Sequence, residues 1–310
     1  MKHILNLVNQ EQSEIEYKKI RYPDGQQSIV ISGEQRKLLP DNACEFFVID
    51  KFKDIDNVII MSRMNNFLDL ELIICANQAL KGVGVKSVSL YVPYFLGGRS
   101  DRKFEFRGVN YLKNVISPII NNQWFDEVYS LDPHSDVLGF CVNNFNARHP
   151  ARISDIDHEN KFDSLRCFFC DNIEICIVAP DAGSYKKVLK FYKSIKNYPT
   201  MWKNLKISFM VADKERDYDG SVSIEIPTLN QSENTRYFVI DDICDGGRTF
   251  IELAKKIKEQ RPNAELYLYV THGIFSNGFE ELNKYFNHIF TTNSVQELEQ
   301  NKNLTQYKVF

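Results

Sequence analysis

The chain has 310 residues, a formal net charge of −3, 43% hydrophobic residues and 25% charged residues. This composition is typical of a globular protein, and the length suggests two domains. The near-neutral charge excludes a broad basic surface for nucleic acid, and no apolar run approaches the roughly 18 residues of a membrane span. The first residues lack the apolar core of a secretion signal. The 7 scattered cysteines indicate reduced thiols, so we expect a cytoplasmic protein.

Apolar runs alternate with helical patterns along the chain, which predicts an α/β fold with mostly parallel sheets. Strands are expected at 3–8, 28–32, 45–50, 58–61, 87–94, 127–131, 173–179, 206–211, 237–240 and 265–271. Helices are expected at 66–80, 107–120, 185–195 and from 249 onward. Because the second half repeats the plan of the first, we expect two pseudo-duplicated domains, 1–150 and 151–310.

The stretch 237–258 combines a strand, an acidic glycine turn and a helix. The apolar run ends in Asp241 and Asp242, the turn continues through Asp245-Gly246-Gly247-Arg248, and the helical pattern begins at Thr249. A turn of this kind binds anions, because the loop amides and the first helix amides point outward without partners. Carboxylates at a strand end can accept hydrogen bonds from sugar hydroxyls or hold a divalent cation. The same residues also fit an ordinary acidic turn before a helix.

Charged residues follow several other predicted strands. The cations of 99–103 suit a polyphosphate, although such a run also fits a solvated loop. Asp132 and His134 end another strand, where an imidazole suits Mg²⁺ if oxygen ligands complete the shell, although a histidine here also fits the surface. The segment 180–183 reads Pro-Asp-Ala-Gly, which also fits a common turn, and 213–216 reads Asp-Lys-Glu-Arg.

Together these segments resemble the ribose-phosphate diphosphokinases, also called phosphoribosyl pyrophosphate synthetases. The stretch 239–249 is also similar to the substrate loop of phosphoribosyltransferases. The similar segments follow the family's order and are RYPDG at 21–25, VPYFLGGRSDRK at 92–103, DPH at 132–134, PDAG at 180–183, DKER at 213–216 and VIDDICDGGRT at 239–249. Motifs in one order over most of the chain are more specific than a single glycine loop.

The resemblance implies two phosphoribosyltransferase-like domains and an enzyme that transfers the β,γ-diphosphate of MgATP to the anomeric 1-hydroxyl of a ribose-5-phosphate unit, releasing AMP. It implies that Lys214 and Arg216 are catalytic, because cations stabilise charge on the transferring group. It assigns ATP binding to Tyr22, Asp24, Arg99, Asp101 and Arg102. It assigns ribose-phosphate binding to Asp241, Asp242, Asp245, Gly246, Gly247, Arg248 and Thr249, and Mg²⁺ binding to His134, Asp181 and Asp132. It also implies small-molecule substrates, no nucleic-acid or membrane partner, and a homo-oligomer that is at least a dimer.

The glycine loop departs from the family pattern, which has Asp-Thr-Gly-Gly-Thr where this chain has Asp-Gly-Gly-Arg-Thr at 245–249. An arginine fork suits a phosphate that continues into a diphosphate. The acceptor is therefore expected to be either ribose 5-phosphate or ADP-ribose, which would give ADP-ribose pyrophosphate in NAD salvage. Arg248 pointing to solvent is the simpler alternative. The family's further C-terminal helix is not expected in 304–310, so oligomer contacts are not carried over from it.

Two other classes of function compete with this prediction. A phosphoribosyltransferase would use the same loop to consume the diphosphate product, but the motifs at 99–103 and 132–134 argue against it. A non-catalytic regulatory homologue would join an active synthetase, but such a protein tends to lose the cations that Lys214 and Arg216 provide.

Overall fold

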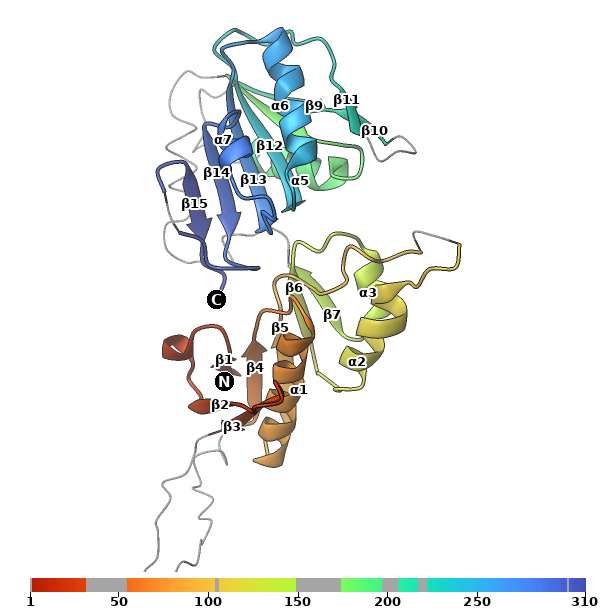
Figure 1. Ribbon diagram of the computed structural model, residues 1–310, viewed down its shortest axis with the longest axis vertical. Helices are drawn as coiled ribbons and strands as arrows, with labels where there is room; N and C mark the ends of the chain where they lie inside the picture. Colours follow the sequence, from red (N-terminus) through yellow and green to blue (C-terminus); the bar gives the residue numbers. More distant parts are fainter. Residues whose placement is uncertain are drawn as a thin grey trace, which may run out of the picture. The chain divides into compact units, whose positions relative to one another are not determined.

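The computed structural model describes residues 2–31, 55–103, 106–148, 174–196, 206–216, 222–299 and 301–310 (Figure 1). The chain divides into two compact units, Met1–Arg148 with Phe310 and His149–Val309. Each unit has its own sheet and core, and each is described by itself. The strand expected at 45–50 lies outside the described residues.

The first unit is built on a five-stranded sheet in the order β1-β4-β5-β6-β7. All four pairings are parallel, between β1 (Lys2–Asn6), β4 (Asn57–Met61), β5 (Ser87–Tyr91), β6 (Val128–Leu131) and β7 (Phe145–Arg148). The helical segments are the 3₁₀ turn η1 (Gln10–Gln12), α1 (Phe67–Gly82), the π-helical turn η3 (Leu112–Ile116), α2 (Ser117–Asn121) and α3 (Val137–Cys141). An antiparallel hairpin of β2 (Tyr17–Arg21) and β3 (Gln27–Ile31) completes the unit.

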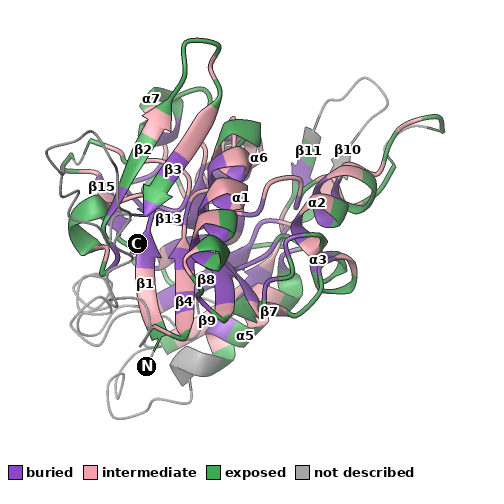
Figure 2. Ribbon diagram, turned by 90° about the horizontal axis from the view of Figure 1, so that it is seen from below, coloured by how far each residue is buried: buried purple, intermediate pink, exposed green. Residues whose placement is uncertain are grey.

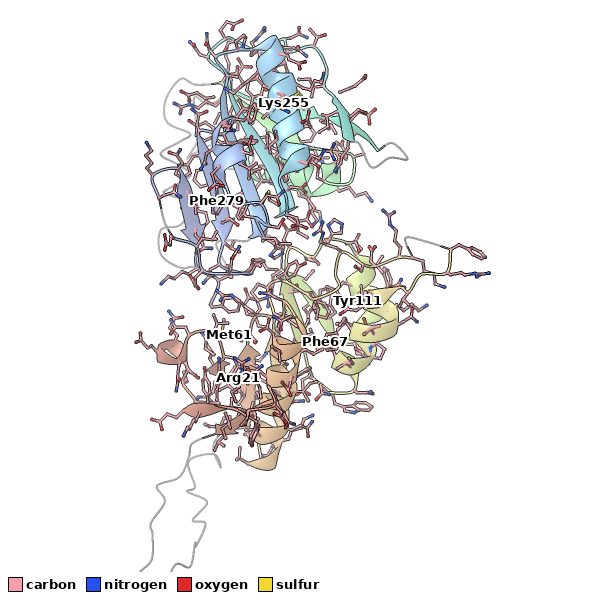
Figure 3. All side chains as sticks on the ribbon, viewed as in Figure 1. Arg21, Met61, Phe67, Tyr111, Lys255 and Phe279 are labelled. Carbon is pink, nitrogen blue, oxygen red and sulfur yellow. The ribbon has the colours of Figure 1, made fainter. Side chains whose placement is uncertain are left out.

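The core of the first unit forms between the sheet and α1. Ile60 of β4 and Leu90 of β5 are fully buried, and Ile73 and Leu80 of α1 belong to the same cluster. Asn66 begins the helix, because its side chain accepts hydrogen bonds from the amides of Leu68 and Asp69. Figure 2 shows buried and intermediate stretches along β1 and β4, and exposed stretches on β2, β3 and α1. Figure 3 labels Met61 at the end of β4 and Phe67 at the start of α1.

The second unit is built on a six-stranded sheet in the order β15-β14-β13-β12-β8-β9, again with only parallel pairings. The strands are β8 (Glu174–Ala179), β9 (Lys206–Val211), β12 (Arg236–Cys244), β13 (Glu265–Gly273), β14 (His288–Thr292) and β15 (Leu304–Tyr307). The helices are α5 (Tyr185–Lys196), α6 (Arg248–Gln260) and α7 (Glu280–Asn283). A separate antiparallel ribbon joins β10 (Asp213–Arg216) to β11 (Val222–Glu225).

Both faces of the second sheet are covered by helices. Along β8, Cys176 and Val178 join the cluster that contains α6 residues such as Leu253. The alternate residue Ile177 joins the cluster that contains Val188 of α5. Because successive strand residues point to opposite faces, α5 lies on one side of the sheet and α6 on the other (Figure 1). The predicted α/β class with mostly parallel sheets is confirmed.

Several elements differ from the sequence expectation. The strand expected at 237–240 continues to Cys244, because β13 pairs with β12 as far as Gly273. The helix expected from 107 begins after Asn110, whose side chain accepts a hydrogen bond from the amide of Lys113. No strand was expected at 213–216, but Lys214 lies on the strand β10, opposite the buried Ile224. Among the described residues, no helix is both long and apolar enough to span a bilayer.

Candidate active site

Acidic residues gather at the carboxyl edge of the second sheet. The neighbouring strands β8 and β12 pair in parallel up to Val178 and Val239. Asp181 follows the end of β8, and Asp241 and Asp242 stand near the end of β12. Ligands of open parallel sheets bind at this edge. The structure therefore brings together three acids that the sequence assigned to a metal and to a sugar phosphate.

Two lysines face these acids from other elements. The Nζ of Lys214 on β10 lies 3.4 Å from Oδ2 of Asp181. The Nζ of Lys187 in the first turn of α5 lies 3.4 Å from Oδ2 of Asp242. The side chain of Asp242 is only 7% exposed and that of Lys214 only 11%. Ion pairs this well shielded interact more strongly than pairs on the surface.

Asp241 lies close to two other acids, Asp242 and Asp181. Burial raises its pKa well above the ordinary value, and the nearby carboxylates of Asp242 and Asp181 raise it further. Its Oδ1 accepts a hydrogen bond from the amide of Asp242 at 2.9 Å. An acid with a raised pKa beside other acids suits a site that receives a divalent cation or hydroxyl donors.

The glycine turn leads directly into α6. Gly247 precedes the helix with φ of 79°, a conformation that side chains other than glycine rarely adopt. A Cβ at this position would lie 3.2 Å from Cδ2 of Leu282. Gly247 offers no side chain to the first amides of α6, so these amides remain suited to an anion. Arg248 is exposed at the first helical position, and Thr249 is half-buried.

The loop after β13 is hydrogen-bonded to the glycine turn that precedes α6. The amides of Ile274 and Phe275 donate to the carbonyl of Cys244 at 2.9 and 3.1 Å. The side-chain amide of Asn277 donates to the carbonyl of Gly246 at 3.4 Å. The rings of Phe275 and Phe279, the latter labelled in Figure 3, lie 4.6 Å apart between their centroids. The turn is therefore held by the sheet on one side and by this loop on the other.

In the first unit, the structure joins two of the predicted segments. The loop of Arg99 follows β5 and the loop of His134 follows β6, and these strands are neighbours. The Oγ of Ser135 donates to Oδ2 of Asp101 at 2.6 Å, and the side-chain amide of Asn110 donates to the Asp101 carbonyl at 2.7 Å. Asp101 is therefore fixed beside the predicted metal-binding segment.

The remaining predicted residues of the first unit occupy distinct environments. Asp132 is buried with a φ of 43°, and its amide donates to the carbonyl of Arg148 at 2.6 Å. Tyr22 and Asp24 form the turn of the β2–β3 hairpin, where Oδ1 of Asp24 accepts the amide of Gln26. Tyr22 is 44% exposed.

Whether the site suits a magnesium ion depends on which side chains are available as ligands. Within the described ranges, no group of three or more histidine, cysteine or acidic side chains is arranged to hold a metal ion. Mg²⁺ is commonly bound by one or two carboxylates, with water and substrate phosphates completing its shell. Asp181 in the second unit and Asp132 with His134 in the first are donor sets of this size. They fit a metal that arrives with a nucleotide.

Two residues of these sites were not predicted from the sequence. Lys187 contacts Asp242, and Ser135 contacts Asp101. Both stand close to a predicted residue in the chain, Lys187 after Asp181 and Ser135 after His134. The spacing alone does not tell which acid of a neighbouring strand they meet. The Arg216 side chain lies outside the described part of the structure.

Curated proteins that are similar in sequence to this chain are named ribose-phosphate pyrophosphokinases. No family model matches the chain. A ribose-phosphate pyrophosphokinase of Mycoplasma genitalium is 25% identical over 306 residues, covering 88% of this chain and 85% of the relative. One of Cereibacter sphaeroides is 25% identical over 232 residues, covering 74% of this chain and 63% of the relative. The chain thus spans less than two thirds of some of these relatives.

A solved structure supports the relationship at the level of the fold. The phosphoribosylpyrophosphate synthetase of Mycobacterium smegmatis superposes with a TM-score of 0.69 at 14% identity, covering 99% of this chain and 94% of the other. The chain is thus similar in sequence to ribose-phosphate pyrophosphokinases and has the fold of a phosphoribosylpyrophosphate synthetase.

Proposed function

We propose that the protein transfers the β,γ-diphosphate of MgATP to the anomeric 1-hydroxyl of a ribose-5-phosphate unit. The hydroxyl oxygen forms a bond to the β-phosphorus and loses its proton. The bond from the β-phosphorus to the oxygen of the α-phosphate breaks, and AMP leaves. The observation that carries the proposal is the convergence of Asp181, Lys214, Asp241 and Asp242 at one sheet edge. The names of the relatives support the same reaction.

The residues of the second unit hold the acceptor in this proposal. Asp241, Asp242 and Asp245 accept hydrogen bonds from the ribose hydroxyls. The amides from Gly246 to Thr249 receive the 5-phosphate at the start of α6. The hydrogen bonds to Cys244 and Gly246 hold the turn before α6 in place. A turn held in this way fixes the position of the acceptor, and positioning supplies much of the rate in phosphoryl transfer.

Lys214 stabilises the transition state, with Arg216 of the same strand as its partner. Negative charge spreads over the transferring diphosphate and the leaving AMP, and a fixed ammonium group offsets it. The Nζ of Lys214 is paired with Oδ2 of Asp181 at 3.4 Å. Exchange of this partner for phosphate oxygens then accompanies binding of the substrates.

The residues of the first unit serve ATP. Arg99, Arg102 and Asp101 hold the nucleotide, with Tyr22 and Asp24 as further contacts. Asp132 and His134 would hold a Mg²⁺ that arrives with ATP, and Asp181 would be the corresponding donor in the second unit. When bound, the ion neutralises charge on the phosphates and polarises the β-phosphorus.

The acceptor is ribose 5-phosphate or ADP-ribose. Arg248 is exposed at the first position of α6, where its side chain could contact an acceptor larger than ribose 5-phosphate, such as ADP-ribose. A guanidinium group there reaches past the 5-phosphate to the second phosphate of a diphosphate linkage, which a monoester does not have.

Two parallel reactions test the proposal. Purified protein, ATP and Mg²⁺ are incubated with ribose 5-phosphate or with ADP-ribose, and AMP and the mass of the product are followed. AMP with either acceptor supports diphosphate transfer and identifies the acceptor. AMP with neither acceptor contradicts it and favours a regulatory homologue. Phosphoribosyl transfer to a base, without any AMP formed from ATP, would favour a phosphoribosyltransferase.

A further inference from the structure

Lys187 faces the acid pair of β12 from a different element. Its Nζ lies 3.4 Å from Oδ2 of Asp242, and the two side chains are 27% and 7% exposed. The pair is therefore only partly screened by water, and each group limits the freedom of the other. The neighbouring Lys186 is exposed and has no described partner, so the contact is particular to one of two adjacent lysines.

The turn before α5 fixes the position of Lys187. The amide of Ser184 donates to Oδ1 of Asp181 at 3.0 Å, and its Oγ donates to the carbonyl of Asp181 at 2.9 Å. The carbonyl of Ser184 accepts the amide of Val188 at 3.0 Å. These hydrogen bonds fix where α5 begins. The segment 181–187 therefore places two charged side chains, those of Asp181 and Lys187, at the site. Asp181 faces Lys214, and Lys187 faces Asp242.

Asp242 depends on such a partner. Its residue is 5% exposed, and a carboxylate buried to this extent is unfavourable unless it is paired. It also stands next in the chain to Asp241, a like-charged neighbour. A fixed ammonium group holds the carboxylate in one orientation and so determines where its oxygens can accept further hydrogen bonds.

We propose that Lys187 is a positioning residue of the acceptor site, which holds Asp242 in the orientation that accepts hydrogen bonds from the ribose hydroxyls. The identity of the acceptor in this statement rests on the proposed function. Lys187 acts through Asp242 and does not touch the reacting atoms. Its loss lowers affinity for the sugar phosphate, while affinity for ATP is unchanged.

Three variants of the full chain test the role. Lys187→Met keeps the length of the side chain and removes its charge, Lys187→Arg keeps the charge, and Lys186→Met is the matched control. Calorimetric titrations in Mg²⁺ measure Kd for ribose 5-phosphate, for ADP-ribose and, separately, for α,β-methylene ATP. Thermal unfolding reports on the fold. AMP formation by the wild type is measured in parallel.

Lys187→Met is expected to weaken acceptor binding about 10- to 100-fold, the effect of losing one hydrogen bond to a charged group. The ATP analogue should bind as before, Lys187→Arg should recover most of the acceptor affinity, and Lys186→Met should match the wild type. Unchanged acceptor binding by Lys187→Met overturns the proposal. An equal loss of both ligands with a lower Tm also overturns it, because that result indicates a structural role.

The outcome for the wild type separates this proposal from the proposed function. If the wild type binds an acceptor but forms no AMP, diphosphate transfer is rejected and the comparison of the three variants still decides the role of Lys187. If the wild type binds neither acceptor, both proposals are rejected.

Discussion

Substitution of Gly247 by alanine tests whether the turn before α6 needs glycine. At φ of 79° an alanine is strained by about 1 to 2 kcal/mol. Its Cβ would also lie 3.2 Å from Cδ2 of Leu282, which is buried, and crowding of one methyl group in a packed core adds about 1 to 2 kcal/mol. The expected loss is therefore about 2 to 4 kcal/mol, or a fall in Tm of about 4 to 16 °C for a unit of this size.

Gly278→Ala is the matched control within the same unit. Its φ is 72°, but its Cβ would meet only the movable end of the Glu280 side chain. It should therefore show the backbone strain alone, about 1 to 2 kcal/mol. Scanning calorimetry gives Tm, and acceptor titrations show whether Gly247→Ala also disturbs the phosphate site. If Gly247→Ala melts with the wild type, or falls no further than Gly278→Ala, the packing argument against Leu282 is wrong.

Three further predictions concern the charged groups. Lys214→Met should lower kcat about 100- to 1000-fold, whereas Lys206→Met, which removes an exposed lysine of the same unit, should leave kcat unchanged; equal rates for the two variants would contradict a catalytic role. Arg248→Ala should raise KM for ADP-ribose about 10-fold or more and spare ribose 5-phosphate; an equal effect on both acceptors would refute a contact with the second phosphate. Because the pKa of Asp241 is raised above its ordinary 3.8, the folded protein keeps a proton that the unfolded chain releases, so stability falls as pH rises through 3.8 and levels off above the folded pKa. Asp241→Asn should remove this loss, so in Mg²⁺-free buffer its Tm should exceed that of the wild type increasingly from about pH 4 upward. The gain in unfolding free energy should be about 1.4 kcal/mol for each unit by which the folded pKa is raised, while AMP formation is lost. A lower Tm with the same pH dependence would refute the argument.

The sequence predicted those elements whose side chains alternate or repeat in a simple way. Buried strands such as β8 and amphipathic helices such as α6 have this property, and both were placed within a few residues. The hairpin strand β2 was missed, because its charged residues Lys18 and Lys19 interrupt the apolar pattern. The continuation of β12 through Asp241 to Cys244 was also missed, since two adjacent acids look like a turn until the pairing with β13 is known.

The acids of the candidate site could be predicted from the sequence, because the carboxyl ends of parallel strands lie at the same edge of a sheet. Asp181 and Asp241 each follow an apolar run, so adjacent strands would bring them to one edge of a sheet. The cation that meets each acid could not be predicted in the same way. The contact of Lys187 with Asp242 depends on how α5 is rotated about its axis, and the contact of Lys214 with Asp181 depends on the ribbon of β10 and β11.

The charge balance at this edge distinguishes a binding site from an ordinary acidic turn. Asp181, Asp241 and Asp242 place three carboxyl groups against the two ammonium groups of Lys187 and Lys214. The excess of acid groups is reflected in the raised pKa of Asp241, so we expect a neutral side chain at this position to make the fold more stable at neutral pH. If the turn had only a structural role, replacing Asp241 by a neutral residue would simply stabilise the protein. A divalent cation or several hydroxyl donors would remove the imbalance, and such ligands are the ones that the proposed reaction brings to this edge.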